Sequence, residues 1–317
     1  MVVRLEASRF PTMSTPNQWD FLDHNLISRL GRLEFSARQP MLGSVTGLHR
    51  SATRGSSVEF AEYRKYVPGD DPKFIDWRVF GRTDRFYMKE FEADTNLRCY
   101  LVVDTSASMK YSSTKETTRF DIARKLAGTM AHLLCHQGDA VGLCLFADKA
   151  LQDLKPKHTT THLRTIFDTL GQAKPQGESN IVETLHEFAE RIKKRSLVII
   201  ISDFLAEPAP LLECFKHLKF HKHDVAAFHL LDRQEFAFDF KRPVRFVDLE
   251  TGGDLITDPS ILRDAYREAV TTYLETLQHG CRGFDVDYHL AYLDGDMEEL
   301  LTNFLLHRIR RRKGTGR

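Results

Sequence analysis

The hydrophobic pattern becomes regular from residue 97 onward, where short apolar runs alternate with helix-length amphipathic segments. The apolar runs are LRCYLVVD, DAVGLCLFAD, SLVIIISD and DVAAFHLL, and the amphipathic segments lie at about 120–137, 160–172, 180–194 and 208–220. Near-continuous apolar strands that alternate with helices are typical of a parallel sheet covered on both faces. We therefore predict an α/β fold with a doubly wound, mainly parallel sheet and right-handed crossovers.

The first 95 residues have a different pattern. One stretch there has apolar residues at a spacing of three to four positions, Trp19, Leu22, Leu26 and Leu30, and predicts a helix. Residues 40–95 are rich in Gly, Ser and Arg and predict an irregular stretch, and we expect this N-terminal region to pack against the sheet domain. We therefore divide the chain into residues 1–95, with this helix and the irregular region, and residues 96–317, with the α/β domain.

Charge and composition narrow the classes of function. The formal net charge is +1, with 45 Lys and Arg against 44 Asp and Glu, so no overall field favours nucleic acid or a membrane. The basic tail RIRRRKGTGR could attract nucleic acid, but basic residues also suit the carboxyl end of the helix predicted before it. No apolar run approaches the roughly 18 residues of a membrane span, and the N-terminus lacks the apolar core of a signal peptide. The five cysteines are scattered without a CxxC pair, so we expect a reduced, cytoplasmic protein.

Oxygen-bearing side chains follow two of the predicted strands. Asp104 and Asp203 each end an apolar run, and ligands of doubly wound sheets bind outside such strand ends. Small hydroxyls accompany them at Ser106, Ser108 and Ser179. Asp and Ser also favour turns and helix caps for local reasons, which is the structural alternative. As a set, however, hard oxygen donors suit Mg²⁺, Mn²⁺ or Ca²⁺ rather than zinc, and would leave one coordination position open to an outside ligand.

Three short elements resemble the metal-ion-dependent adhesion site of von Willebrand factor A domains. DTSAS fits the DxSxS motif of that family, GESNI resembles its Gly-x-Thr/Ser-x loop, and IISDF resembles its third element. The resemblance implies a von Willebrand factor A-like fold and Mg²⁺ or Mn²⁺ bound by Asp104, Ser106, Ser108, Ser179 and Asp203. The open position would then bind a carboxylate of a protein partner.

A longer segment, residues 47–94, resembles the signature of the bacterial family called domain of unknown function fifty-eight. It carries the pattern G…RS…RG…F…YR.Y.PGDD…IDW…RT, and LLDRQEF, VDLETGG and EELLTNFLLHR resemble later landmarks of that family. Many members carry N-terminal membrane helices, whereas this sequence implies a soluble form. Because members commonly accompany MoxR-type AAA+ ATPases, the resemblance implies such an ATPase as the first partner to consider.

The segment PGDDPKFIDWRVFGR, residues 68–82, has two interpretations. In the structural one, Asp71 caps a short helix, Pro72 takes its first position, Gly81 closes it, and Phe74 and Trp77 dock onto the sheet domain. In the other, arginines among aromatic residues build a recognition surface, because guanidinium groups pair with carboxylates or phosphates. We predict a docking or fold-stapling role rather than catalysis, with partner-binding residues Arg64, Asp70, Asp71, Arg78 and Arg82.

The stretch CFKHLKFHKHD places Cys214, His217, His221 and His223 close together, as a zinc site would. His217 and His221 would share a helical face. The chain leaves the helix between Phe220 and His223, however, and the intervening lysines indicate solvent. We therefore predict a solvated stretch in preference to a zinc site.

These patterns favour a metal-dependent protein-interaction module, an adaptor or co-chaperone that presents clients to an AAA+ ATPase, over an enzyme. The enzymatic alternative is a phosphohydrolase with Asp104 as nucleophile. Haloacid-dehalogenase-type phosphatases place a second Asp two residues later to protonate the leaving group, and this chain has Ser106 there. A structural paralogue with an empty site is the remaining alternative.

Overall fold

The computed structural model of the chain describes residues 19–31, 58–65, 75–93, 97–114, 117–240 and 244–314. The predicted partner-binding residues Asp70 and Asp71 lie outside these ranges.

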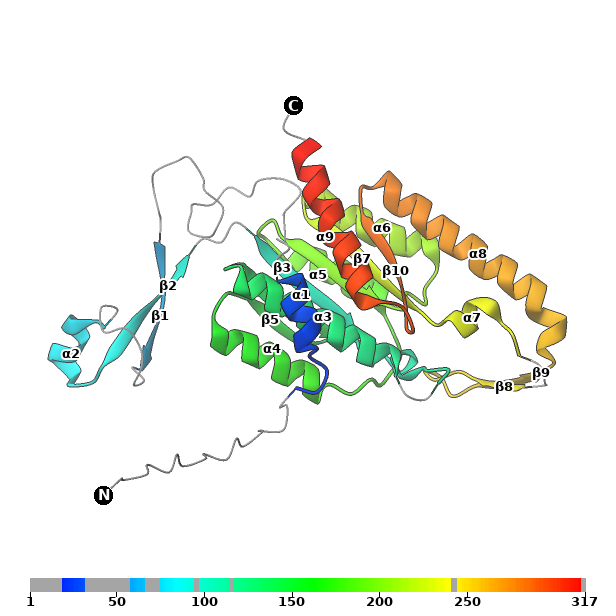
Figure 1. The fold of residues 1–317 in the computed structure, drawn as a ribbon, viewed down its shortest axis with the longest axis horizontal. Coiled ribbons are helices and arrows are strands. Elements are labelled where there is room, and N and C mark those ends of the chain that lie inside the picture. Colours follow the sequence, from blue (N-terminus) through cyan, green and yellow to red (C-terminus); the bar gives the residue numbers. More distant parts are fainter. Residues whose placement is uncertain are drawn as a thin grey trace, which may run out of the picture.

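One six-stranded sheet forms the centre of the molecule, in the order β10-β7-β6-β3-β4-β5 (Figure 1). Five strands are parallel to their neighbours: β3 (Arg98–Asp104), β4 (Ala140–Phe146), β6 (Leu197–Ser202), β7 (Asp224–Leu231) and β10 (Asp287–Tyr292). The edge strand β5 (Ala150–Lys157) pairs antiparallel with β4. The predicted doubly wound, mainly parallel sheet is therefore confirmed, and the direction of strand order reverses between β3 and β6.

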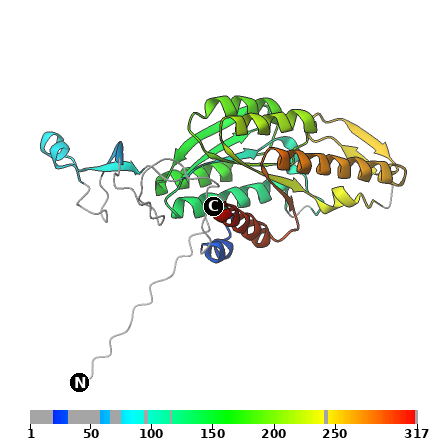
Figure 2. The same ribbon diagram turned by 90° about the horizontal axis from the view of Figure 1, so that it is seen from above.

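Helices cover both faces of the sheet (Figures 1 and 2). Alternate strand residues divide the core, because Leu101 and Val103 pack on one face whereas Val102 packs on the other. The first face carries α1 (His24–Leu30), α3 (Arg119–His136), α4 (Thr160–Gln172) and α9 (Met297–Gly314). The second face carries α5 (Ile181–Arg191), α6 (Pro208–Phe220) and α8 (Pro259–Gly283). Among the described helices, none has an apolar stretch of the length that a membrane span requires.

The helix predicted near residue 22 is α1, which begins at His24 because the Asp23 carboxylate caps it by accepting from the backbone N–H groups of Asn25 and Leu26. Trp19 lies just before it and donates from its indole nitrogen to Asp168 of α4 at 2.8 Å. Leu26 and Leu30 of α1 are buried in the same core cluster as α3 and α9. This part of the N-terminal region therefore packs against the sheet domain, as predicted.

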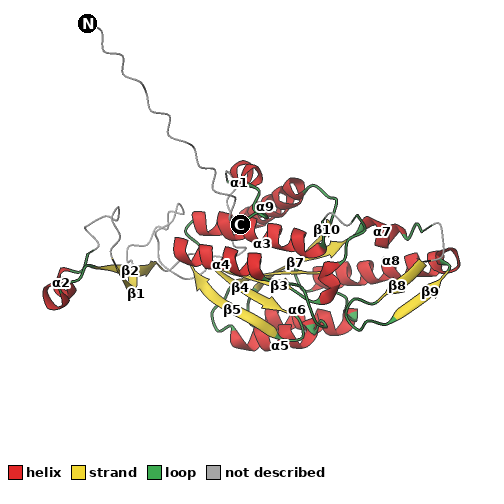
Figure 3. Cartoon of the chain, turned by 90° about the horizontal axis from the view of Figure 1, so that it is seen from below, coloured by secondary structure: helices red, strands yellow, loops and turns green. Residues whose placement is uncertain are grey.

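The region predicted to be irregular contains an antiparallel strand pair instead, formed by β1 (Val58–Lys65) and β2 (Tyr87–Ala93). The short helix α2 (Trp77–Thr83) lies between these strands in the sequence. Figures 1 and 3 show β1, β2 and α2 at one side of the main sheet. The alternating pattern of VEFAEYRK and YMKEFEA carried this signal, which the high Gly and Arg content of the region obscured.

Three details predicted for α2 are wrong. Its cap is Asp76 rather than Asp71, since the Asp76 carboxylate accepts from the backbone N–H of Arg78 at 2.9 Å, and the helix continues past Gly81 to Thr83. Trp77 is 60% exposed and packs its ring against Phe80 and Phe86, so it does not serve as the predicted anchor onto the sheet domain.

After β7 the chain forms a short helix, α7 (Arg233–Ala237), and an antiparallel hairpin of β8 (Val244–Val247) and β9 (Asp254–Thr257). The turn of this hairpin carries Glu250. It brings that carboxylate back to the carboxyl edge of the main sheet, where it accepts from Ser179.

Candidate metal centre

The predicted site residues meet at the carboxyl edge of the sheet, where the strand order reverses. Asp104 is the last residue of β3, and Asp203 directly follows the neighbouring parallel strand β6. Both side chains are buried, with Asp104 at 0% exposure. The reversal point of a doubly wound sheet is the place where such folds bind their ligands.

The DxSxS loop turns so that its polar side chains converge. The Asp104 carboxylate accepts from the backbone N–H of Ser106 at 2.8 Å. The hydroxyls of Ser106 and Ser108 lie 2.9 Å apart at the start of a short 3₁₀ helix, Ala107–Lys110. Thr105 points elsewhere, because its hydroxyl donates to the backbone oxygen of Phe146 at the end of β4 at 2.7 Å. Asp104, Ser106 and Ser108 therefore form one connected group.

Ser179 joins this group from the loop before α5. Backbone hydrogen bonds attach that loop to the DxSxS loop, from Ala107 to Gly177 and from Gln176 to Thr105, each at 2.8 Å. Gly177 has φ +79°, a left-handed conformation that glycine adopts without strain. The Ser179 hydroxyl then lies 3.5 Å from Asp104 Oδ2. A local turn supplies the fourth of the five predicted residues.

Asp203 has a cationic partner that the sequence did not reveal. Arg119, at the first turn of α3 and only 3% exposed, donates from Nη1 to Asp203 Oδ2 at 2.8 Å and to the backbone oxygen of Ser108 at 3.1 Å. Its Nη2 pairs with Glu235 of α7. The other oxygen, Asp203 Oδ1, is buried and accepts no hydrogen bond from any residue that the structure describes. One carboxylate oxygen at this edge thus remains available to a further cation.

Two more residues at the site were missed. Ser202, the last residue of β6, donates to Asp104 Oδ2 at 2.7 Å, and its own oxygen accepts from the backbone N–H of Phe204 at 2.9 Å. Phe204 has φ +49°, an uncommon conformation for a non-glycine residue and one that recurs at functional sites. Ser202 stands beside Asp203 in SLVIIISDF, so its hydroxyl was a visible signal.

Glu250 is the second missed residue. Its Oε2 accepts from the backbone N–H of Ser179 at 3.1 Å, across 71 residues of sequence. Its Oε1 is buried and, within the described part of the chain, has no hydrogen-bond partner. The only sequence signal was its place in VDLETGG, a landmark of the family resemblance.

The electrostatics indicate uncompensated negative charge at Asp104. Burial first, and then the nearby charge of Asp203, raise the pKa of Asp104 to about 7, although hydrogen bonds from Ser106 and Ser202 act in the opposite direction. Burial and the charge of Arg119 lower the pKa of the neighbouring His229 to about 3, so this ring is neutral and adds no positive charge. The phenolic oxygen of Tyr288 lies 2.6 Å from His229 Nδ1, and the ring also hydrogen-bonds the backbone oxygen of Asp203.

The residues present fit a hard divalent cation. The donor set contains carboxylate and hydroxyl oxygens only, and two buried carboxylate oxygens, Asp203 Oδ1 and Glu250 Oε1, have no partner among the described residues. Hydrogen bonds or ion pairs connect all five predicted residues, directly or through Arg119. The metal itself stays a prediction.

Three of the predicted partner-binding residues lie in β1 or α2, beside the main sheet. Arg64 belongs to β1, and Arg78 and Arg82 are exposed on α2, where Arg82 Nε donates to the backbone oxygen of Arg78 at 3.4 Å. The exposed Trp77 ring lies on the same helix.

Solved structures that match the chain share little of its sequence. The conserved hypothetical protein BatB from Bacteroides thetaiotaomicron is 14% identical, with a TM-score of 0.46, and the match covers 68% of this chain and 99% of that one. The vWF domain of the type V pili tip protein Mfa5 from Porphyromonas gingivalis is 10% identical, with a TM-score of 0.34, and the match covers 67% and 94% of the two chains.

Mycobacterial relatives are more similar in sequence. The uncharacterized proteins Rv1480 of Mycobacterium tuberculosis and Mb1516 of Mycobacterium bovis are each 29% identical over 271 residues, which is 83% of this chain and 84% of theirs. Residues 62–275 match the family described as protein of unknown function DUF58. Because this match spans more than half of the sequence, the chain belongs to the DUF58 family, as the signature at residues 47–94 predicts.

Proposed function

We propose that this protein is a metal-dependent protein-interaction module. Asp104, Ser106, Ser108, Ser179 and Asp203 hold Mg²⁺ or Mn²⁺ at the carboxyl edge of the sheet. A carboxylate of a protein partner completes the coordination of the ion.

The unpartnered Oδ1 of Asp203 is the observation that carries this proposal. A buried carboxylate oxygen without a partner is costly, and natural structures contain few of them. Asp104 lies beside it with a raised pKa and no arginine or lysine among its hydrogen-bond partners in the described residues. A divalent cation would compensate both charges.

The chain's own residues divide the work at such a site. Asp104 and Asp203 supply negative charge, and the hydroxyls of Ser106, Ser108 and Ser179 supply neutral oxygens. Ser202 orients Asp104 through its 2.7 Å hydrogen bond, and Arg119 binds Asp203 Oδ2 while Oδ1 accepts no hydrogen bond from a described residue. A bound divalent cation would supply an open coordination position that attracts an anionic oxygen.

The surroundings of the site suit a protein partner. Leu205, two residues after Asp203, is 63% exposed. The β8–β9 hairpin, whose turn reaches Ser179, exposes Leu255 and Ile256 at 57% and 72%. Protein interfaces combine apolar contacts of this kind with a few polar anchors. The exposed Trp77, Arg78 and Arg82 of α2 offer a second contact surface, since aromatic and arginine side chains are enriched at interfaces.

A MoxR-type AAA+ ATPase is the first partner to test, with client proteins as the second. This choice rests on the family resemblance. An adaptor could bind a client carboxylate through the metal at the carboxyl edge of the sheet and contact the ATPase through the exposed residues of α2.

The phosphohydrolase alternative receives less support. Asp104 is 0% exposed, and its two oxygens already accept from Ser106 and Ser202, so the carboxylate is poorly placed to attack a substrate. Ser106, where that mechanism needs an acid, is engaged with Ser108.

Calorimetric titration of Mg²⁺ and Mn²⁺ into the full chain tests the proposal. Saturable binding should disappear in Asp104→Ala and persist in Asp139→Asn, a matched control. Asp139 is also a buried aspartate with a raised pKa, but it precedes β4 at the opposite edge of the sheet.

Pull-down of the ATPase with and without chelator then tests the partner. Undiminished partner binding in excess EDTA would favour the structural paralogue.

A further inference from the structure

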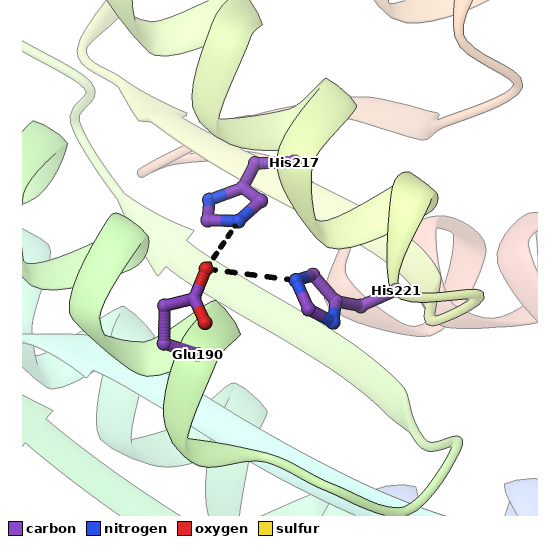
Figure 4. A group of neighbouring side chains, drawn as sticks. All are labelled: Glu190, His217 and His221. Atoms are coloured by element: carbon purple, nitrogen blue, oxygen red, sulfur yellow. Dashed lines mark hydrogen bonds and ion pairs between the residues drawn. The ribbon is translucent and has the colours of Figure 1, made fainter.

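A second group of side chains of the kinds that bind metals lies where α5 packs against α6. Figure 4 shows Glu190 of α5 pointing toward His217 of α6 and toward His221, the residue that directly follows α6. His217 Nε2 is 2.9 Å from Glu190 Oε1, and His221 Nε2 is 3.7 Å from the same oxygen. One ligand atom from each of the three residues lies within 4.8 Å of the other two.

This group differs from the one that the stretch CFKHLKFHKHD suggested. Cys214 and His223 point inward, because the Cys214 thiol contacts the backbone oxygen of Val182 and His223 Nδ1 accepts from the backbone N–H of Ser196. His217 and His221 do share a face, and α6 ends at Phe220 as expected. Glu190, 27 residues from His217, supplies the ligand that the sequence pattern lacked.

The separations suit a transition metal. Tetrahedral Zn²⁺ binds nitrogen and oxygen at about 2.0–2.1 Å, which places neighbouring ligand atoms about 3.3 Å apart. The two separations from Glu190 Oε1, 2.9 and 3.7 Å, lie on either side of that value, and the ligand atoms of the two histidines lie within 4.8 Å of each other. Small rotations of the side chains would therefore complete three coordination positions, with the fourth open to water.

His186 supplies the supporting contact that metal-binding histidines normally have. Its Nδ1 lies 2.9 Å from His217 Nδ1, so one of the two nitrogens must carry the hydrogen. When His217 offers Nε2 to a metal, its Nδ1–H donates to His186. Such a hydrogen bond fixes both the tautomer and the ring orientation of a ligating histidine.

We propose that Glu190, His217 and His221 form a binding site for a Zn²⁺-class transition-metal ion, with His186 as the positioning residue for His217. The site lies at the carboxyl ends of two helices, whose partial negative charge favours a cation. The Glu190 side chain is 67% exposed, so the ion enters from solvent. The ion would join α5 and α6 at the ends opposite to Ser179 and Asp203, which precede the starts of these helices.

Titration of Co²⁺ into the untagged, metal-stripped full chain tests this site. We expect the bound Co²⁺ to show the visible absorption of a four-coordinate complex. One equivalent of Zn²⁺ per chain should displace the Co²⁺ and remove this absorption. His221→Ala and Glu190→Gln should each weaken Zn²⁺ binding at least about tenfold and abolish that absorption. His186→Ala should weaken binding by about tenfold, the cost typical of losing an outer-shell partner, while the absorption persists.

Two variants serve as controls for these measurements. His279→Ala removes an exposed histidine of α8 and should change neither Zn²⁺ affinity nor the spectrum. Asp104→Asn should also leave both unchanged, which keeps this site distinguishable from the proposed Mg²⁺ centre. Equal Zn²⁺ affinity in wild type, His221→Ala and Glu190→Gln would overturn the proposal, as would a Co²⁺ complex without the four-coordinate spectrum.

Discussion

Two pairs of buried aspartates occupy opposite edges of the same sheet, and they are compensated differently. At the amino edge, Asp224 and Asp287 begin β7 and β10 and share one fully buried arginine, Arg308 of α9. Arg308 Nη1 donates to Asp287 Oδ2 at 3.0 Å, and Nη2 donates to Asp224. At the carboxyl edge, Asp104 and Asp203 also lie at the ends of neighbouring strands, but of these two aspartates Arg119 pairs with Asp203 and not with Asp104.

The difference separates a structural ion cluster from a candidate ligand site. Arg308 supplies each of its two carboxylates with a guanidinium nitrogen. Arg119 divides its charge between Asp203 and Glu235, while Asp104 receives only hydroxyl and backbone donors in the described structure. Both carboxylates of the amino-edge pair therefore have a guanidinium partner, whereas Asp104 at the carboxyl edge has none among the described residues and can take a cation from outside the chain.

Removal of Arg308 should give the largest loss of unfolding free energy. Arg308→Met leaves two buried carboxylates without their shared cation, and loss of one partner from a buried pair costs about 3–5 kcal/mol of unfolding free energy. Urea unfolding measures the loss, and added Mg²⁺ should not restore it. The triple variant Arg308→Met, Asp224→Asn, Asp287→Asn should recover most of the stability. A loss below about 1 kcal/mol in the single variant would show that the amino edge does not depend on this arginine.

Substitution of Asp104 by Asn should raise the unfolding free energy of the metal-free protein, whereas loss of Arg308 lowers it. The pKa of Asp104 rises from an ordinary 3.8 to about 7 in the folded state. Between these values the folded chain holds a proton that the unfolded chain has lost, so wild-type stability falls as pH rises and stays low above about pH 7. Asp104→Asn has no such proton and should be more stable than wild type by about 1–3 kcal/mol near pH 8, with a smaller difference near pH 4.

Urea unfolding in EDTA at both pH values measures this difference. Burial also raises the pKa of Asp139 to about 7, but that residue is present in both proteins and cancels in the comparison. A stability gain of equal size at the two pH values would contradict the electrostatic explanation. Addition of Mg²⁺ should stabilise wild type and leave Asp104→Asn unchanged.

The sequence was informative wherever a local pattern determines the structure. Apolar runs predicted β3, β4, β6 and β7, and their terminal residues placed Asp104 and Asp203 at one edge without any knowledge of contacts. Strand β5 has a mostly exposed pattern and pairs antiparallel, so a search for buried parallel strands missed it.

The compensating residues were harder to predict than the acids. Arg119 meets Asp203 across 84 residues, and Arg308 meets Asp224 across another 84, so no short motif joins them. The pairing depends on how α3 and α9 pack against the sheet. Sequence therefore located the charges, and only the packing of helices showed which charges remain uncompensated.

Ser179 should separate metal binding from stability. Its hydroxyl makes a long contact, 3.5 Å, to Asp104 Oδ2, so Ser179→Ala should change the unfolding free energy by less than about 0.5 kcal/mol. Loss of a ligand oxygen should nevertheless weaken Mg²⁺ binding about tenfold by calorimetry. Ser179→Thr keeps the oxygen and is the matched control, with affinity expected within about twofold of wild type. Equal affinities in all three proteins would remove Ser179 from the site.

Glu250 should give the smallest effect, and it tests whether the β8–β9 hairpin belongs to the carboxyl edge. Glu250→Gln keeps an oxygen for the backbone N–H of Ser179 but removes one negative charge from a half-buried position. The attraction of a nearby dication to that charge, screened by solvent, is worth somewhat less than about 1 kcal/mol, so Mg²⁺ affinity should fall about threefold.

Glu178→Gln is the control for this charge, because Glu178 is an exposed neighbour of Ser179 in the sequence. The Mg²⁺ affinity of this variant should stay at the wild-type value. Unchanged Mg²⁺ binding in Glu250→Gln would separate the hairpin from the metal centre. A fall as large as that of Asp104→Asn would instead make Glu250 a ligand, and the carboxyl edge would then hold three acidic ligands where the DxSxS resemblance implies two.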